Sequence, residues 1–208
     1  MRPLVLVGGG GHCKSVIDVA ESAGYAIKGI LDIPDLLGVK ILNYRVIGID
    51  EDFYKYVQDC DFVVTLGFIK DPSHRIGLHD KILDAGGSLA TIVAPTARIS
   101  KYAEIGPGTV VLHNATINAD TNIGMGCIIN TGAIIEHDVV IGDYCHISTG
   151  AIVNGGCHVG DASFIGSQSV LRNGISVEPR CVVGAGSVVC SNILQQGIYF
   201  GNPARMKK

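Results

Sequence analysis

The chain has 208 residues, of which 47% are hydrophobic, 17% are charged and 28 are glycine, and it contains no tryptophan. With so few aromatic residues, the core has to be built from Ile, Val, Leu, Ala and Cys, which favours β-structure with tight turns. The formal charge of −3 provides no basic surface for nucleic acid, and the apolar stretch at residues 4–7 is too short for a signal peptide or a membrane span. We therefore expect a cytoplasmic protein that binds no nucleic acid, inserts into no membrane and acts on a small molecule.

The first elements form a pattern of strand, glycine-rich turn and helix. Residues 4–7 are apolar throughout and predict a buried strand, and residues 14–23 carry the apolar positions of an amphipathic helix. Between them lie four consecutive glycines and His12. Main-chain N–H groups at such a helix N-terminus bind phosphate, whereas the simpler interpretation is a tight turn without a ligand.

A second strand, expected over residues 26–31, ends at Asp32, which lies 24 positions after Gly8. That spacing is close to the one between the first glycine and the ribose-binding acidic residue of a Rossmann unit. Cys13 stands where the complete dinucleotide fingerprint has its third glycine. The pattern therefore favours a single nucleotide over a dinucleotide.

A third strand and a second helix complete the first domain. The strand is expected over residues 62–66 and ends at Gly67, and Asp71 precedes a helix that runs to about residue 85. We expect residues 1–88 to form a small Rossmann-like α/β domain, which is too short for two mononucleotide-binding halves.

The rest of the chain repeats with a period of six. From Val93 to Val189, every sixth residue is Ile, Val or Leu, and the residue two positions earlier is Ala, Ser, Thr or Cys except at Val139 and Ile175. This period fits neither an α-helix nor an alternating strand, so each hexad is expected to hold a short extended run and a corner. Three hexads close one coil of 18 residues, and residue n stacks on residue n + 18 in parallel strands about 4.8 Å apart.

Glycine follows the large aliphatic residue in six of the hexads, at Gly106, Gly124, Gly142, Gly160, Gly166 and Gly184. We expect these glycines to supply the positive φ that a corner needs.

The seven cysteines are an odd number without a Cys-x-x-Cys pair, which argues against a disulfide framework and against a zinc knuckle. Four of them belong to the small-residue series: Cys127, Cys145, Cys157 and Cys181. We expect these to be buried core residues, and we expect no metal ion.

A glycine-rich α/β domain joined directly to Ile/Val/Leu-Gly-x4 hexads resembles the bacterial sugar acyltransferases of the sialic acid O-acetyltransferase NeuD family, which includes the PglD-type N-acetyltransferases of UDP-linked 4-amino sugars. The resemblance is carried by Gly8-Gly-Gly-Gly-His12, Leu31-Asp32, Leu66-Gly67, the segment from Ile135 to Gly142, Cys145-His146-Ile147 and Gly201-Asn-Pro-Ala204. It implies that residues 89–208 form a left-handed parallel β-helix with a C-terminal tail, that the chain assembles as a homotrimer, and that acetyl-CoA is the co-substrate.

The resemblance also implies the catalytic residues. His137 becomes the general base that accepts a proton as the acceptor amine attacks the thioester, and Asp138 orients its imidazole ring. Gly155 lies 18 residues after His137, one coil further on. By resemblance its main-chain N–H stabilises the acyl oxygen, and its missing side chain leaves room for the acetyl group.

Binding residues follow from the same resemblance. It assigns the nucleotide to Gly10, Gly11, His12, Asp32 and Gly67, and coenzyme A to His146, Ser167 and Ala185. Separately from the resemblance, we expect Glu136 to line the site and Asn130, which follows an inward aliphatic residue, to contact the substrate. For Asn130 the simpler interpretation is a turn residue, and for His146 it is a structural histidine. PglD-type sequences often have two consecutive aspartates where this chain has Asp32-Ile33, a departure that bears on the preference for base and sugar.

We therefore predict an N-acetyltransferase of a nucleotide-linked amino sugar, with a UDP-4-amino-4,6-dideoxy sugar as the expected acceptor, in bacterial surface-glycan or glycoprotein synthesis. An alternative is O-acetylation of sialic acid or a related sugar, which Asp32-Ile33 and residues 153–156 favour. More remote alternatives are a non-catalytic scaffold and a γ-type carbonic anhydrase. The sequence lacks the His-x4-His pair of that lyase, because His137, His146 and His158 are spaced by nine and twelve residues.

Overall fold

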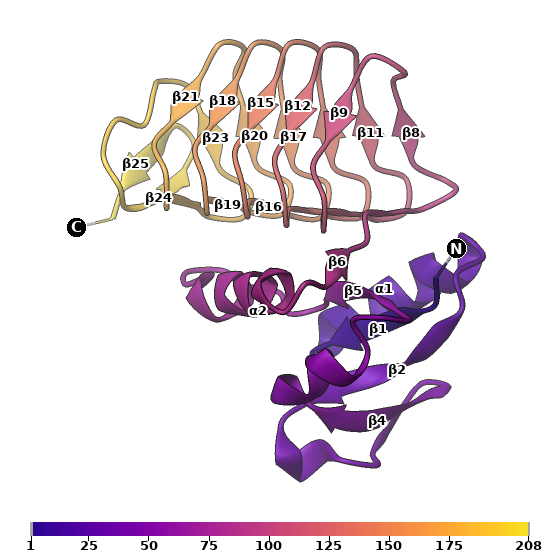
Figure 1. Cartoon of the computed structure of the whole chain (residues 1–208). Helices are drawn as coiled ribbons and strands as arrows, with labels where there is room; N and C mark the ends of the chain where they lie inside the picture. The colour runs from indigo at the N-terminus through magenta and orange to yellow at the C-terminus, as the bar shows by residue number, and fades with distance from the viewer. Residues whose placement is uncertain (1, 208) are drawn as a thin grey trace.

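The computed structural model describes residues 2–207 and consists of an α/β domain attached to a coil of short stacked strands (Figure 1). The α/β domain contains β1 (Leu4–Val7), α1 (Gly11–Ser22), β2 (Ile27–Asp32), the 3-10 helix η1 (Pro34–Leu36), β3 (Lys40–Ile41), β4 (Tyr44–Ile49), the 3-10 helix η2 (Asp50–Lys55), β5 (Asp61–Val64), α2 (Ser73–Asp84) and β6 (Ser88–Leu89).

These strands form one sheet in the order β3-β4-β2-β1-β5-β6, in which only β3 and β4 pair antiparallel. Alternate residues of β1 point to opposite faces of the sheet. Leu4 and Leu6 pack in the cluster that includes α1, and Val5 and Val7 pack in the cluster that includes α2. Because both faces are covered, the strand is apolar at every position instead of alternating.

Several details of this domain differ from the sequence-based expectation, since the short strands β3 and β6 were not predicted and two further differences affect the candidate site. Helix α1 begins at Gly11 and not at residue 14, and Gly10 occupies its N-cap position. The sequence did not reveal this first turn because it consists of weak helix formers. Strand β4 was not predicted, although it pairs in parallel with β2. It brings a further loop to the carboxyl edge of the sheet.

The second part of the chain is a parallel β-helix, as predicted. Its strands are β7 (Ile92–Val93), β8 (Arg98–Ile99), β9 (Glu104–Ile105), β10 (Val110–Val111), β11 (Thr116–Ile117), β12 (Asn122–Ile123), β13 (Ile128–Ile129), β14 (Ile134–Ile135), β15 (Val140–Ile141), β16 (His146–Ile147), β17 (Ile152–Val153), β18 (His158–Val159), β19 (Phe164–Ile165), β20 (Val170–Leu171), β21 (Ser176–Val177), β22 (Val182–Val183), β23 (Val188–Val189), β24 (Ile198–Gly201) and β25 (Ala204–Met206).

The strands form three sheets, one for each side of the coil. The first face consists of β7, β10, β13, β16, β19, β22, β24 and β25, the second face of β8, β11, β14, β17, β20 and β23, and the third face of β9, β12, β15, β18 and β21. Ile117 pairs with Ile135, which pairs with Val153, so the predicted stacking of n on n + 18 is confirmed. The aliphatic series and the small-residue series fill the interior together.

The expectation for the six repeat glycines was wrong. Positive φ occurs at every sixth residue from 108 to 186, directly before the small residue, and non-glycine residues such as Asp138 adopt it too. Gly106 and the five glycines like it lie outside that region of φ. All of them except Gly184 are required by space, because a Cβ at position 106 would lie 2.6 Å from the carbonyl carbon of Gly124 in the next coil, and one at position 166 would lie 2.6 Å from the nitrogen of Ala185.

The four cysteines of the small-residue series are buried, as predicted, and all seven cysteines have free thiols. The thiol of Cys127 lies 3.1 Å from the carbonyl oxygen of Gly142, and the hydroxyl of Thr109 donates to the carbonyl of Gly124 at 2.8 Å. Thr109 and Cys127 stack at the corner between the third and first faces, and the Cys127 thiol takes the same position there as the Thr109 hydroxyl. No helix within residues 2–207 combines the length and the hydrophobicity needed to cross a bilayer.

A matched pair of substitutions tests the packing of the coil. Ile123 is 1% exposed inside the coil, and its neighbour Asn122 points outward. We expect Ile123→Ala to lower the free energy of unfolding by about 2–5 kcal/mol through lost burial and a cavity, and Asn122→Ala to change it by less than about 0.5 kcal/mol. Chemical denaturation measures both, and equal effects would contradict the assignment of inward positions.

Candidate active site

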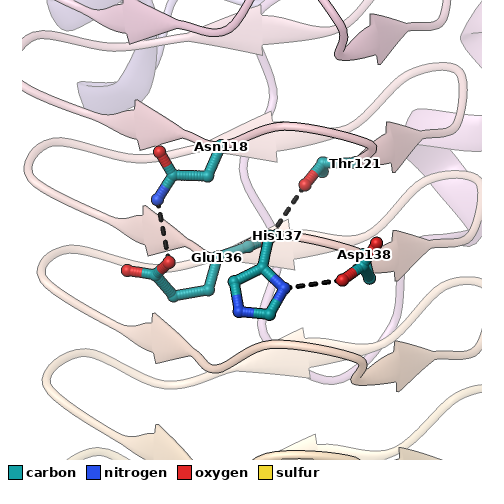
Figure 2. A network of polar contacts seen from close by, with 5 residues as sticks. All are labelled: Asn118, Thr121, Glu136, His137 and Asp138. Atoms are coloured by element: carbon teal, nitrogen blue, oxygen red, sulfur yellow. Dashed lines mark hydrogen bonds and ion pairs between the residues drawn. The ribbon is translucent and has the colours of Figure 1, made fainter.

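The predicted catalytic pair lies at the corner where the second face turns into the third. His137 follows β14 and Asp138 precedes β15, and Figure 2 shows their side chains facing each other. Nδ1 of His137 is 2.6 Å from Oδ2 of Asp138, and the hydrogen bond to this carboxylate raises the pKa of His137. Since a carboxylate accepts, Nδ1 carries the proton and Nε2 keeps its lone pair. Asp138 has φ 60°, a corner conformation that Asp tolerates.

Gly155 lies directly beside the His137 ring in the next coil. A Cβ at position 155 would be 2.7 Å from Cε1 of His137, so a larger residue would displace the imidazole. Gly156 donates its N–H to the carbonyl of His137 at 3.1 Å, whereas the N–H of Gly155 has no acceptor within residues 2–207. An unused N–H donor therefore lies one coil away from the proposed base.

Glu136 is held from the preceding coil. Its Oε2 accepts a hydrogen bond of 2.9 Å from Nδ2 of Asn118, and its carbonyl accepts one of 2.8 Å from Thr121 (Figure 2). Both donors fix Glu136 beside His137. His137 and Asp138 remain 61% and 58% exposed, so the corner is open on the surface of the single chain.

The predicted nucleotide residues gather at the carboxyl edge of the α/β sheet. The N–H of Gly9 donates to Oδ2 of Asp32 at 2.5 Å, and a side chain added at Gly10 or Gly11 would meet no atom within 4 Å. Gly67 lies beside His12, 3.8 Å away measured from the position of its missing Cβ. This edge is where open α/β sheets bind their ligands, and the N-terminus of α1 adds N–H groups suited to phosphate.

Two residues at this edge were missed by the sequence analysis. Thr65 is fully buried and donates to the main-chain oxygens of Val7 and Gly8, which fixes the start of the glycine-rich turn. Asp50 begins η2 directly after Ile49, the β4 residue that pairs with Asp32. Its buried Oδ1 has no hydrogen-bond partner among residues 2–207, and burial followed by the Asp32 charge raises its pKa. Recognising β4 from the aromatic and β-branched residues at 44–49 would have revealed Asp50.

His146 and Asn130 lie between the two domains and not beside His137. Nδ1 of His146 donates to the carbonyl of Phe68 at 3.0 Å, and Nε2 is 3.1 Å from Nδ2 of Asn130. Phe68 and Phe164 contact the ring edge to face, and burial lowers the pKa of His146 to about 4. Both nitrogens of this neutral ring are thus satisfied within the chain, and a contact with coenzyme A stays a prediction.

Ser167 and Ala185 stack at the corner between the first and second faces. Ser167 shares a hydrogen bond of 2.9 Å with Ser148, and Ala185 is exposed. They are separated from His137 by the width of the second face. Within the described residues 2–207, no three His, Cys, Asp or Glu side chains are grouped as ligands for a metal ion.

We call the carboxyl edge of the α/β sheet, where the predicted nucleotide residues gather, the nucleotide edge. The nucleotide edge and His137 lie on different sides of the β-helix. The α/β domain packs on the first face, where Ile92, Val110 and Leu112 join its core, whereas His137 is at the corner opposite that face. Figure 1 shows the α/β domain on one side of the coil and the second and third faces meeting on the other. One chain therefore does not bring its own nucleotide edge to its own His137.

Three family models match the sequence. The PglD N-terminal domain matches residues 3–82, the six-repeat bacterial transferase hexapeptide matches 120–155, and the hexapeptide repeat of succinyl-transferase matches 157–191. A search of curated proteins found no match.

Solved structures resemble the whole chain. A histidine-to-asparagine variant of perosamine N-acetyltransferase from Caulobacter crescentus, in complex with CoA and GDP-perosamine, is 31% identical, with a TM-score of 0.93 and coverage of 100% of this chain and 98% of that chain. The acetyltransferase domain of PglB from Neisseria gonorrhoeae is 28% identical, with a TM-score of 0.92 and full coverage of both chains. The same domain is also solved with acetyl coenzyme A.

The buried histidines make the fold sensitive to acid. Burial lowers the pKa of His79 and of His146 to about 4, while both titrate near 6.5 when unfolded. Between pH 6.5 and 4 the unfolded chain binds more protons, so we expect each histidine to lower the free energy of unfolding by up to about 1.4 kcal/mol per pH unit as the pH falls.

Denaturant unfolding between pH 7 and 4.5 measures this slope. His146→Gln should make it shallower, and His158→Gln, at an exposed position of β18, should leave it unchanged. An unaltered slope in His146→Gln would show that His146 does not titrate in this window.

Proposed function

The chain belongs to the hexapeptide-repeat sugar acetyltransferases that carry a PglD N-terminal domain, and from this membership we propose that it transfers acetyl from acetyl-CoA to a nucleotide-linked amino sugar. Perosamine N-acetyltransferase, which covers the whole chain, is solved with CoA and a GDP-linked amino sugar. The observation that carries the proposal is the His137–Asp138 pair beside Gly155, because it provides a base and a free N–H donor on adjacent coils.

In acetyl transfer, the side chains of this corner handle the proton and a main-chain N–H stabilises the oxyanion. His137 accepts a proton at Nε2 as the amine nitrogen attacks the thioester carbonyl, and Asp138 holds the proton on Nδ1 and stabilises the imidazolium. The Gly155 N–H donates to the oxyanion that forms on the carbonyl. The carbon–sulfur bond then breaks, the amide remains on the sugar, and coenzyme A leaves with the proton that His137 took up.

The α/β domain supplies the acceptor. The N–H groups at the start of α1, around Gly10 and Gly11, suit a diphosphate, and the Asp32 carboxylate suits a ribose hydroxyl. Our proposed acceptor is a UDP-linked 4-amino-4,6-dideoxy sugar. The GDP sugar bound by the Caulobacter crescentus enzyme makes GDP the main competitor. O-acetylation of sialic acid is the second candidate, since Ile33 replaces the second aspartate and is 51% exposed.

We also propose a homotrimer, in which the nucleotide edge of one copy faces the His137 corner of the next. The separation of the two half-sites within one chain supports this arrangement, as does the open surface around His137. Contacts with coenzyme A at Ser167, Ala185 and His146 belong to the same proposal. We propose a cytoplasmic location, where acetyl-CoA and nucleotide sugars are available.

A thiol-release assay with acetyl-CoA tests the function and the base together. We expect turnover with one or more amino sugars from a panel of UDP, GDP, dTDP and CMP sugars, and a loss of about 100-fold to 10,000-fold in kcat for His137→Ala. His158→Ala is the matched control and should keep full activity. Near-normal turnover by His137→Ala would refute the mechanism, and turnover of CMP-sialic acid alone would favour the O-acetyltransferase.

The pH profile tests Asp138 separately. The hydrogen bond and charge of Asp138 raise the pKa of His137, with a smaller contribution from the Glu136 charge. Because only neutral His137 acts as a base, kcat falls as the pH drops through this pKa. We expect Asp138→Asn to shift the acid limb of kcat to lower pH and Glu136→Gln to shift it less. An unmoved acid limb in Asp138→Asn would mean that this limb belongs to another group.

A further inference from the structure

A buried arginine joins the two domains. Arg75 lies in α2, its side chain is among the largest fully buried ones, and only 1% of the residue is exposed. Its Nη1 donates to the carbonyls of Val64 and Leu66 at 2.5 and 2.8 Å. Its Nη2 and Nε donate to the carbonyl of Gly126 at 3.0 and 3.3 Å. The first two acceptors belong to the α/β domain, and the third belongs to the β-helix.

This cation has no carboxylate partner within residues 2–207. Burial lowers its pKa to about 10, so it is still charged at neutral pH. Three histidines share this region, His12, His79 and His146, and in each the pKa is lowered by burial and further by the Arg75 charge. An unpaired buried charge is a costly way to gain stability, since apolar side chains of similar volume often do as well or better. We therefore ascribe to Arg75 a geometric role, which follows from the positions that its hydrogen bonds impose on the main chain.

The carbonyls that Arg75 contacts are well placed to set that geometry. Val64 ends β5, and Leu66 immediately precedes Gly67 at the nucleotide edge. Gly126 lies at the corner between the third and first faces of the coil. One rigid guanidinium thus connects the main chain of the nucleotide edge with the main chain of the coil.

The surroundings of Arg75 leave little freedom. Nδ1 of His79 donates to the Arg75 carbonyl at 2.8 Å, and the His79 ring is packed so that a Cβ at Gly108 or Gly126 would be only 3.3 Å from it. Tyr144, one coil beyond Gly126, contacts His79 edge to face with ring centroids 5.4 Å apart. The junction is therefore close-packed on the coil side as well as on the α2 side.

We propose that Arg75 is a positioning residue, which fixes the nucleotide edge of the α/β domain against the β-helix so that the bound acceptor meets the transfer site at a set distance and angle. This inference rests on the proposed function. Within residues 2–207, the Arg75 side chain hydrogen-bonds only to the main chain of Val64, Leu66 and Gly126, and through that main chain it acts on the site. Small displacements of a bound reactant reduce the rate steeply, whereas they leave the binding of the other reactant intact.

The test compares two acceptors in Arg75→Lys, which keeps the charge but cannot reach all three carbonyls with one planar group. One acceptor is the nucleotide-linked amino sugar that wild type uses, and the other is the same amino sugar without its nucleotide, at high concentration. We expect kcat with the linked acceptor to fall by about 10-fold to 100-fold. The rate with the free amino sugar and the affinity for coenzyme A should change less than about twofold, since the free sugar has no nucleotide for the α/β domain to hold and the proposed coenzyme A residues lie on the β-helix.

Two further variants guard against a failure to fold. His79→Ala opens the same junction while leaving the Arg75 hydrogen bonds in place, and it should give a smaller selective loss on the linked acceptor. Arg98→Lys, at an exposed position of β8, is the control and should change neither rate.

Equal losses on both acceptors, or a lower melting temperature with unchanged rates, would overturn the positioning role. Wild-type turnover of the linked acceptor tests the proposed function itself, and without that turnover both proposals fall. If wild type is active and Arg75→Lys shows no selective loss, only the role of Arg75 is rejected.

Discussion

Hydrogen bonding between residues 18 positions apart is the constraint on which the rest of the structure depends. Each coil pairs with the next through its main chain, and the large aliphatic side chains of the hexads fill the interior together with the small-residue series. No room is left inside for polar chemistry, so reactive groups can only stand at the corners. The corner that holds His137 shows how this works, because Asp138 takes the positive φ that the turn requires and thereby brings its carboxylate to the imidazole. The repeat and the catalytic pair share one backbone geometry.

The α/β domain has a different role in the proposed function, which is to hold the nucleotide-linked sugar at the carboxyl edge of its sheet. Its glycine-rich turn is shaped by Asp32 and Thr65, both of which bond to the main chain at or next to the turn. The domain itself is held on the first face by polar contacts as well as by apolar packing, with Arg75 and His146 each bonding to a carbonyl of the other domain. Such contacts are directional, so they fix an orientation, whereas apolar packing alone tolerates sliding.

Much of this architecture could be predicted from the sequence, because hexads and their stacking follow from the period alone. The role of the glycines in the hexads could not be predicted, since a glycine in the sequence is explained equally well by a positive φ and by a lack of space for a side chain. Gly106 needed the coordinates of Gly124 to decide between them. Arg75 was missed for a related reason, because its surroundings are assembled from segments far apart in the chain and no local spacing marks it. Asp50 was missed because the strand before it, β4, was not predicted. The burial of His146 could not be predicted either, because it depends on Phe68, which lies 78 residues away in the sequence.

The strict stacking of n on n + 18 also limits how such a chain can change in length. An insertion or deletion of 18 residues adds or removes a whole coil and keeps every interior column and every corner aligned, whereas adding or removing one or two hexads moves every later hexad to another face. One added coil shifts all later residues by about 4.8 Å along the axis. The number of coils between the α/β domain and His137 therefore acts as a spacer, which sets in discrete steps how far the catalytic corner lies from the domain that holds the acceptor.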